Sequence, residues 1–452
     1  MDELVMTLRA LNPQVWVQAA GRLLCQVGYG LINFYIPILF VNQVGLSATS
    51  VGLSVGLSAV TEILGHFLGG AIADSRFGRK SALEISAVLG ILVTLILIIS
   101  DSLLTLTCAS LLLGISLGFY WTASSAAVMD AATPAERPQA FALMGVMEYL
   151  GVGIGVLGGG LVLALVEETP QQVFGFCGLV FGLFAILIWR AMPAPPRAEP
   201  AAEPGVEPGV EPKQSAPEQS DQLSELGAKR GFWVALQDRA LLLFVGANIF
   251  YATYVALVTS TIPLYFTNYV AGADELPGVS LGSTANLFTW CYVGLGAVVQ
   301  LPLAQALGQF RRTRVLMGAI LLWAAGFCLL WAAGSFASAQ FAWAILGLCL
   351  LSVASVAYKP FSVAIVSDLA PESLRGSYMA VSSQAWTVGY FIGPILGGWA
   401  MDQSAAWAHL FWLGIAASAA GCIGLLWLFE RLQPEFLPSH ILNEQPKAEP
   451  LA

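Results

Sequence analysis

Long apolar segments separated by short polar ones run along almost the whole chain of 452 residues. Each apolar segment has roughly 20 residues or more, the length that an α-helix needs to cross the hydrocarbon core of a bilayer. The pattern therefore predicts an all-α membrane protein with twelve transmembrane helices, at approximate positions 15–41, 48–72, 82–100, 103–129, 139–165, 171–190, 240–269, 281–307, 314–334, 339–367, 377–401 and 407–429.

One long polar stretch interrupts this alternation in the middle of the chain. Residues 191–231 contain the run Ala-Glu-Pro-Ala-Ala-Glu-Pro-Gly-Val-Glu-Pro and few large apolar side chains, a composition typical of disorder. We therefore expect four parts: an N-terminal six-helix bundle at residues 1–190, a disordered cytoplasmic linker at 191–231, a C-terminal six-helix bundle at 232–430, and a polar cytoplasmic tail at 431–452.

The two halves of the chain repeat. The motif Ile36-Pro37-x-x-Phe40-x-Asn42 recurs as Ile262-Pro263-x-x-Phe266-x-Asn268. A second set matches at identical spacing, with Asp130, Arg137, Gly151, Gly155 and Gly159 corresponding to Asp368, Arg375, Gly389, Gly393 and Gly397. Ordered matches at both ends of each half indicate a parallel duplication of a six-helix unit.

Charge is scarce and unevenly placed. Only 10% of the residues are charged, whereas soluble domains contain about 25%. Of the 19 Lys and Arg residues, Arg22 and Lys359 fall inside predicted helices, and the others lie in loops and tails on one side. The loops on the opposite side contain none. Basic residues concentrate on the cytoplasmic side of membrane proteins, so this asymmetry places both termini in the cytoplasm.

Several function classes lack the residues that they need. The sequence contains no Gly-x-x-x-x-Gly-Lys-Ser/Thr loop, which disfavours an ATP-driven pump. The seven cysteines fall in apolar segments at spacings unlike those of a metal site, so we expect neither a metal centre nor disulfides. No nucleophile–base arrangement supports an enzyme, and the sequence indicates no cofactor and no nucleic-acid partner.

The densest charge cluster of the first half lies between the second and third predicted helices. It reads Gly70-Ala-Ile-Ala-Asp74-Ser-Arg76-Phe-Gly78-Arg79-Lys80. It resembles the loop between helices 2 and 3 of the major facilitator superfamily, Gly-x-Leu-Ala-Asp-Arg-x-Gly-Arg-Lys, although Asp74 and Gly78 are one residue further apart here. The resemblance implies the fold of that superfamily, two six-helix bundles, and a loop that acts as a conformational latch between them.

A second charge pattern follows the fourth and tenth predicted helices and resembles the Asp-x-x-Pro-x-x-x-Arg-Gly turns of the same superfamily. Its members are Asp130, Arg137, Asp368, Glu372 and Arg375. One interpretation is helix capping and ion pairing at the membrane surface. The other is that these residues, with Asp74, close the cytoplasmic face and separate when it opens. The two interpretations are compatible.

Glycines spaced four residues apart mark the fifth and eleventh predicted helices and let helix backbones approach closely. They are Gly151, Gly155 and Gly159 in the first half, and Gly389, Gly393 and Gly397, with Pro394, in the second. In drug–proton antiporters of the superfamily the Gly-Pro form lies on helix 5, and helix 4 carries an arginine four residues before its glycine. Here the proline is on the eleventh helix, and Ser110 occupies the arginine position.

Charged side chains inside predicted helices point to function, because each costs roughly 2.5–3.5 kcal/mol on insertion scales. Arg22, Glu62, Glu148 and Lys359 are such residues, and His66 lies one turn from Glu62. They could form static buried ion pairs, and Arg22 could extend to the cytoplasmic surface. Alternatively, Glu62 or Glu148, with His66 nearby, carries the proton of a coupled transporter, and Lys359 contacts Glu148 or an anionic substrate.

The resemblance also implies that helices 1, 4, 7 and 10 line the substrate path, with helices 2, 5, 8 and 11 beside them. Amphipathic aromatic side chains and amides on these helices suit an amphiphilic small organic substrate, although each aromatic ring could instead pack or face lipid. The candidates are Arg22, Gln26, Tyr29, Asn33, Tyr120, Trp121, Asn248, Tyr251, Tyr254, Lys359, Gln384 and Trp386.

These features predict a secondary active transporter that acts as a monomer in the inner (plasma) membrane of a bacterium. We expect it to export a small organic molecule by alternating access coupled to protons, as the antiporter-like branch of the superfamily does. One alternative is uptake or facilitated passage of a metabolite or organic anion, bound by Arg22 and Lys359. A less favoured alternative is a non-transporting receptor on the same fold.

Overall fold

The computed structural model describes residues 11–133, 136–165, 170–193, 232–270, 281–336, 339–371 and 374–433. The regular elements in these ranges are all helical. The first half contains α2 (Pro13–Asn42), α3 (Ala48–Asp74), α4 (Gly78–Ile98), α5 (Leu103–Ala131), α6 (Arg137–Leu165), the short 3₁₀ turn η1 (Pro170–Gln172) and α7 (Val173–Ala191). The second contains α9 (Arg239–Tyr269), α10 (Leu281–Leu287), η2 (Phe288–Gly294), α11 (Leu295–Leu307), α12 (Arg312–Ser335), α13 (Gln340–Leu369), α14 (Arg375–Met401) and α15 (Ala405–Leu432).

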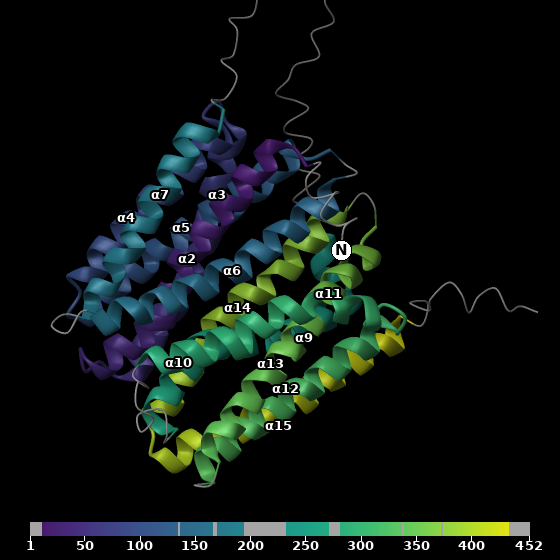
Figure 1. The fold of residues 1–452 in the computed structure, drawn as a ribbon. Coiled ribbons are helices and arrows are strands. Elements are labelled where there is room, and N and C mark those ends of the chain that lie inside the picture. Colours follow the sequence, from purple (N-terminus) through teal and green to yellow (C-terminus); the bar gives the residue numbers. More distant parts are fainter. Residues whose placement is uncertain are drawn as a thin grey trace, which may run out of the picture.

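These helices form two bundles, as the sequence predicts (Figure 1). In the first bundle α3 packs on α5 and α2 on α6; in the second α12 packs on α13 and α9 on α14. The bundles meet along α3 and α14, α2 and α9, and α6 with α10 and η2. Because the halves repeat, each of these helices has its counterpart in the other bundle.

Ten helices in the described part of the chain are long and apolar enough to cross a membrane. The other two predicted spans are α14 and the continuous run α10–η2–α11. Sequence reasoning missed that the middle of this run, residues 288–294, is a π-helix, a rare form that is frequent at functional sites. Residues 194–231 and 434–452 lie outside the described part, so the disorder of the linker and tail stays a prediction.

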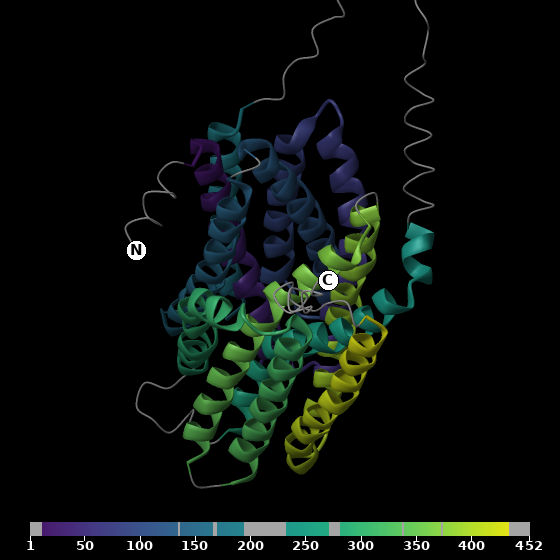
Figure 2. The ribbon, with the colours of Figure 1, turned by 90° about the vertical axis from the view of Figure 1, so that its right-hand side faces the viewer.

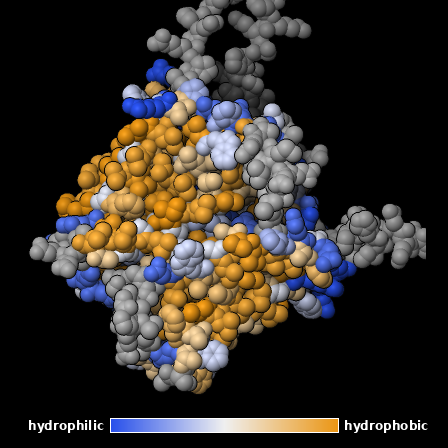
Figure 3. Space-filling model, viewed as in Figure 1, coloured by the Kyte–Doolittle hydropathy of each residue, from blue (hydrophilic) through white to orange (hydrophobic). Residues whose placement is uncertain are grey.

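The outer surface fits a bilayer. Large apolar side chains cover both bundles and polar ones gather at their ends (Figure 3). On α3 the exposed residues Leu53, Val60, Leu64 and Phe67 recur at helical spacing and form a lipid-facing side. Before α9, a short helix at residues 232–237 stands beside the second bundle (Figure 2). The seven cysteines are free in this structure, and Cys108 and Cys328 lie on the exposed surface.

The spaced glycines lie at helix crossings inside each bundle. A Cβ on Gly151 or Gly155 of α6 would meet the backbone of α2, and one on Gly159 would meet the ring of Tyr35. In the second bundle, Gly389, Gly393 and Gly397 face Ala252, Ala256 and Thr261 of α9 in the same way. The repeated glycines therefore allow the same close crossing in both halves.

The two faces of the molecule differ in how the bundles meet. We call the face formed by the helix ends at residues 42–48, 269 and 401–405 the distal face. The proximal face contains the helix ends at 74–78, 131–137 and 369–375. At the distal face, Asn42 of α2 hydrogen-bonds to Asn268 of α9, and Asp402 after α14 hydrogen-bonds to the start of α3. At the proximal face, the charged residues pair within their own bundles, as described below.

Candidate transport site

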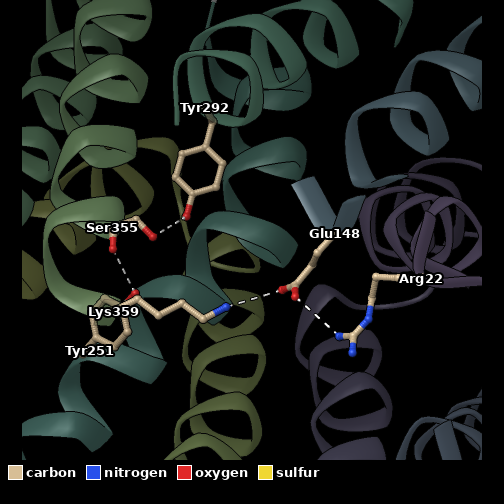
Figure 4. Close-up of polar contacts among 6 residues, drawn as sticks. All are labelled: Arg22, Glu148, Tyr251, Tyr292, Ser355 and Lys359. Atoms are coloured by element: carbon tan, nitrogen blue, oxygen red, sulfur yellow. Dashed lines mark hydrogen bonds and ion pairs between the residues drawn. The ribbon is translucent and has the colours of Figure 1, made fainter. Parts of the chain in front are cut away.

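Glu148 of α6 lies between two cations that come from different bundles (Figure 4). Its Oε2 is 3.7 Å from Nη1 of Arg22, on α2 of the same bundle, and its Oε1 is 3.5 Å from Nζ of Lys359, on α13 of the other bundle. These three residues lie at similar depths, because each is roughly 10 residues from the proximal end of its helix. The ion pair with Lys359 therefore joins the two bundles.

Arg22 is held inside the first bundle and does not extend to the surface. Its side chain is only 4% exposed. The guanidinium lies 4.4 Å from the ring centroid of Trp121 and 5.3 Å from that of Tyr120, and Nη2 donates to Oγ of Ser124 at 3.3 Å. Cation–π contact and the acid together offset the cost of burying this charge. Arg22 is therefore a fixed positive group that keeps Glu148 in place.

Lys359 has a more open environment. Its side chain is 49% exposed, and Nζ lies 6.0 Å from the ring centroid of Trp386. One turn earlier on α13, Ser355 accepts hydrogen bonds from two tyrosines of neighbouring helices. Oη of Tyr251 donates to its carbonyl at 3.2 Å, and Oη of Tyr292 donates to its hydroxyl at 3.4 Å. Arg22, Glu148 and Lys359 form a charged triad, in which Lys359 is the more exposed cation.

Sequence reasoning missed Tyr292, Ser355 and Ser124. Tyr292 belongs to the π-helix η2, and Oγ of Ser352 donates to its carbonyl at 2.6 Å. No sequence signal announces a π-helical turn in an apolar segment. Ser355 did carry a signal, because it lies four residues before Lys359 and so shares its side of α13.

The second acid, Glu62, lies on α3 with His66. Its Oε1 is 3.8 Å from Nε2 of His66, and the two side chains are 28% and 44% exposed. Glu62 lies roughly 140° around the helix from the lipid-facing Phe67, so it points away from lipid. Both acids lie on helices, α3 and α6, that contact the other bundle.

Two of the predicted cavity residues are buried inside their own bundles in this structure. Tyr29 is buried within the first bundle, where its hydroxyl is 2.7 Å from that of Ser116. Tyr254 is buried within the second bundle, with its hydroxyl 2.7 Å from that of Ser418 on α15. In membrane helices both the lipid-facing and the packed sides are apolar, so the sequence does not show which side a tyrosine occupies.

The other candidates differ in exposure. Tyr251 is buried and its ring stacks on Tyr358 at 4.0 Å between centroids, with Trp386 at its edge. Asn248 is buried and accepts a hydrogen bond from Ser362 at 2.7 Å. The buried Gln26 lies where α2 crosses α6, next to Gly151. Asn33 and Trp121 are half-buried, Tyr120 is buried beside Arg22, and Gln384 is exposed.

The expected latch residues pair within their own bundles. Nε of Arg79 is 2.9 Å from Asp130 and its Nη2 is 3.5 Å from Asp74, all in the first bundle. In the second bundle Asp368 pairs with Arg312. Glu372 lies outside the described residues, and Arg137 and Arg375 are the exposed first residues of α6 and α14.

The loop that contains Asp74 has a defined local structure. Gly78 has φ +73°, a left-handed conformation that favours glycine, and α4 begins there. Nζ of Lys80 donates to the carbonyls of Trp189 and Met192 at 2.7 and 2.8 Å, where a cation stabilises the end of α7. Arg76 stacks over Phe77, and Gly70 lies near Thr122 of α5. The carboxylate of Asp74 remains 74% exposed.

The distribution of chemistry suits binding and transfer of charge rather than catalysis. No group of three or more potential metal ligands lies together in the described ranges. The site instead offers two acids, two cations and several aromatic rings on helices of both bundles.

Comparison with known proteins gives a consistent picture. A family model described as "Major Facilitator Superfamily" matches residues 19–289 and 275–450. The chain is 24% identical to "Multidrug resistance protein MdtH" of Escherichia coli (strain K12 / DH10B), over 87% of this chain and 88% of that protein. It has the same identity and coverage with the protein of that name from Shigella boydii serotype 4 (strain Sb227).

Solved transporter structures share the fold. A peptide transporter POT in complex with sulfate superposes with a TM-score of 0.74 at 13% identity, covering 94% of this chain and 95% of that one. The nucleoside transporter NupG superposes with a TM-score of 0.68 at 13% identity, covering 91% and 98%. At these identities the likeness concerns the arrangement of helices.

Proposed function

Because the chain belongs to the major facilitator superfamily, we propose that this integral membrane transporter exports small organic molecules in exchange for protons, with Glu148 as the coupling acid. The observation that carries the proposal is the position of Glu148 between Arg22 and Lys359. An ionised Glu148 attracts Lys359 and so favours contact between the bundles. A protonated Glu148 loses that attraction, so proton occupancy and bundle arrangement are linked.

The export direction rests on the relatives and on the walls of the site. The relatives that match 87% of the chain are named multidrug resistance proteins. Trp121 and Trp386 lie beside the two cations of the triad. Aromatic faces next to charged groups suit an amphiphilic molecule with a flat apolar part. Glu62 and His66 provide a second polar pair, on α3, which would serve either protons or substrate.

A second candidate is a carrier of organic anions. Arg22 and Lys359 carry two positive charges against the single negative charge of Glu148. An anionic substrate would take the place of the Glu148 carboxylate between these cations. Protonation of Glu148 would then favour substrate binding, so proton and anion would travel together. The two candidates therefore predict opposite effects of pH on binding.

Substrate affinity is expected to fall at acidic pH. An exchanger requires proton and substrate to exclude each other, so one competing proton weakens binding by up to about tenfold per pH unit. Purified protein would be screened against amphiphilic organic compounds by thermal shift, and the hits titrated between pH 5.5 and about pH 8.5, where His and perturbed carboxylates change charge. Stronger binding at acidic pH would instead favour the anion carrier.

We further propose the orientation and division of the chain that the basic residues and the linker indicate. Both termini would lie in the cytoplasm of a bacterial inner-membrane protein, with the distal face outside. The bundles at residues 1–190 and 232–430 would be joined by a flexible linker, and the protein would act as a monomer. The charges at Asp74, Arg79, Asp130 and Asp368 would form a latch once the proximal ends of the bundles approach.

Sidedness can be measured with introduced cysteines. Ser404→Cys lies on the distal face and is expected to react in intact cells with a membrane-impermeant thiol reagent. Gln309→Cys lies on the exposed turn between α11 and α12 at the proximal face, and it should react only after permeabilisation. The parent protein, with its seven cysteines, supplies the background. Labelling of Gln309→Cys in intact cells would reverse the orientation.

A further inference from the structure

The end of α14 is bonded directly to the beginning of α3 across the boundary between the bundles. Oδ1 of Asp402 accepts from the backbone N–H of Ala48 at 2.7 Å, and Oδ2 accepts from that of Thr49 at 2.8 Å. The hydroxyl of Thr49 also donates to Oδ2. One carboxylate of the second bundle thus receives three hydrogen bonds from the first.

The chemistry of a helix start explains why an acid fits there. The first backbone N–H groups of a helix have no acceptor within the helix, and they form its positive end. Ser47 caps α3 from within the first bundle by accepting from the N–H of Ser50 at 3.2 Å. Asp402 accepts from the N–H groups of Ala48 and Thr49, which Ser47 does not bind. The loops of this face contain no Lys or Arg, so the helix start is the positive partner available to Asp402.

The repeated motif Ile-Pro-x-x-Phe-x-Asn meets itself at the same face. Nδ2 of Asn42 donates to Oδ1 of Asn268 at 2.8 Å, and Nδ2 of Asn268 donates back to Oδ1 of Asn42 at 2.9 Å. Equivalent residues of the two halves thus form a reciprocal pair between α2 and α9. This pairing gives the asparagines of the repeated motif a structural role outside the transport site.

Behind these polar contacts the bundles are tightly packed. A Cβ on Gly52 of α3 would clash with the carbonyl of Pro394 on α14, and one on Gly56 would meet the carbonyl of Phe391 at 2.7 Å. Val51 and Ser260, which face this boundary from the two bundles, are buried. The hydrogen bonds therefore lie at the rim of a closed boundary.

We propose that Asp402, together with the Asn42–Asn268 pair, is a lock that holds the distal face closed and must break each time this face opens. Every group in this distal lock is at or near the surface, so water replaces its partners when the bundles part. The lock is therefore reversible and biases the balance between closed and open states by a modest factor. It contacts neither Glu148 nor the aromatic walls, so it sets conformation and not substrate choice.

The test reads the state of the boundary directly. Ser260→Cys places a thiol in the buried boundary, and its rate of reaction with a membrane-impermeant reagent from the distal side reports opening. Asp402→Ala is expected to raise this rate about tenfold, as loss of a helix cap and a favourable charge does for comparable equilibria. Asp402→Asn keeps one acceptor oxygen and should give a smaller increase. Asn42→Ala should also raise the rate.

Asp101→Asn is the matched control, because Asp101 is an exposed acid of the same face. It should leave the rate unchanged, and Ser404→Cys labelling in each variant corrects for amount and access. Equal rates in Asp402→Ala, Asp402→Asn and Asp101→Asn would overturn the lock. If Asp402→Ala fails to fold, Asp402→Asn and Asn42→Ala decide. The labelling experiment needs no substrate and no pH gradient, so failure of the distal lock can be distinguished from failure of the proposed export.

Discussion

Replacing Glu148 with Gln is expected to abolish substrate movement driven by a pH gradient while exchange of substrate without a gradient continues. The amide mimics a permanently protonated acid, so the site no longer gains and loses a proton in each cycle. Lys359 then loses its attraction to the first bundle. In proteoliposomes, net flux should fall to the rate of protein-free vesicles, whereas counterflow should persist.

Glu430→Gln provides a matched control for this experiment. Glu430 is also a partly buried acid between two arginines, with Oε1 3.3 Å from Nη1 of Arg311 and 4.0 Å from Nε of Arg314. It lies near the end of α15, away from the transport site, so coupling should be intact. Loss of both flux and counterflow in Glu148→Gln would make the acid a substrate ligand or a structural ion pair. Full gradient-driven flux would remove Glu148 from coupling.

The same experiment distinguishes the two candidate acids. Glu62→Gln should reduce coupling less than Glu148→Gln, because the partner of Glu62 is His66 on its own helix and not a cation of the other bundle. Breaking a buried pair costs about 3–5 kcal/mol when a charge is left unpaired, and Arg22 is buried. Thermal stability of each variant should therefore be measured, so that a folding defect is not mistaken for uncoupling.

Gly118→Val and Gly52→Val are expected to have different effects: the first on folding, the second on the balance between conformations. A Cβ on Gly118 of α5 would clash with the backbone of α3 at Glu62 and His66, inside one bundle. Overpacking costs typically 1–3 kcal/mol and more where backbones touch, and no domain movement relieves this clash. Gly118→Val should therefore lower the yield of folded protein and its melting temperature sharply.

The clash at Gly52 lies between bundles and disappears when they part. Gly52→Val should consequently fold but favour the state with an open distal face, which Ser260→Cys labelling would detect. Gly182→Val is the control for both, since a Cβ there would meet nothing within 4 Å. Equal loss of folded protein in Gly52→Val and Gly118→Val would mean that the boundary between bundles is as permanent as the packing within one.

Much of the architecture could be predicted because it follows from strong constraints. A bilayer requires long apolar helices with internal hydrogen bonds, so the positions of the spans are readable from hydropathy. Buried charge is costly, so Arg22, Glu148 and Lys359 were identifiable as functional candidates before their contacts were known. The repeated residues likewise indicate two equivalent halves, and each half of the chain forms one helical bundle (Figure 1).

The side of each helix that faces the path was harder to predict. Tyr29 and Tyr254 lie on helices expected to line the path, but their hydroxyls bond within their own bundles. The apolar pattern of a membrane helix does not distinguish lipid from protein contacts, so the sequence does not show this. Sequence alone allows two partners for Lys359, Glu148 or an anionic substrate, because Glu148 comes from a helix some 200 residues earlier in the chain. The π-helical turn that carries Tyr292 has no signal in the local sequence, and Ser352 of α13 donates to its backbone there.

The reciprocal bonds between Asn42 and Asn268 also bear on the ancestry of the chain. Each asparagine donates one bond and accepts one from its counterpart, so the contact is isologous and either partner could be replaced by a copy of the other. A six-helix polypeptide carrying this motif once could therefore pair with a second, identical polypeptide through the same two bonds. The contact is compatible with a twofold-symmetric homodimer that preceded gene duplication and fusion, and it would have needed no new residues when the two genes joined.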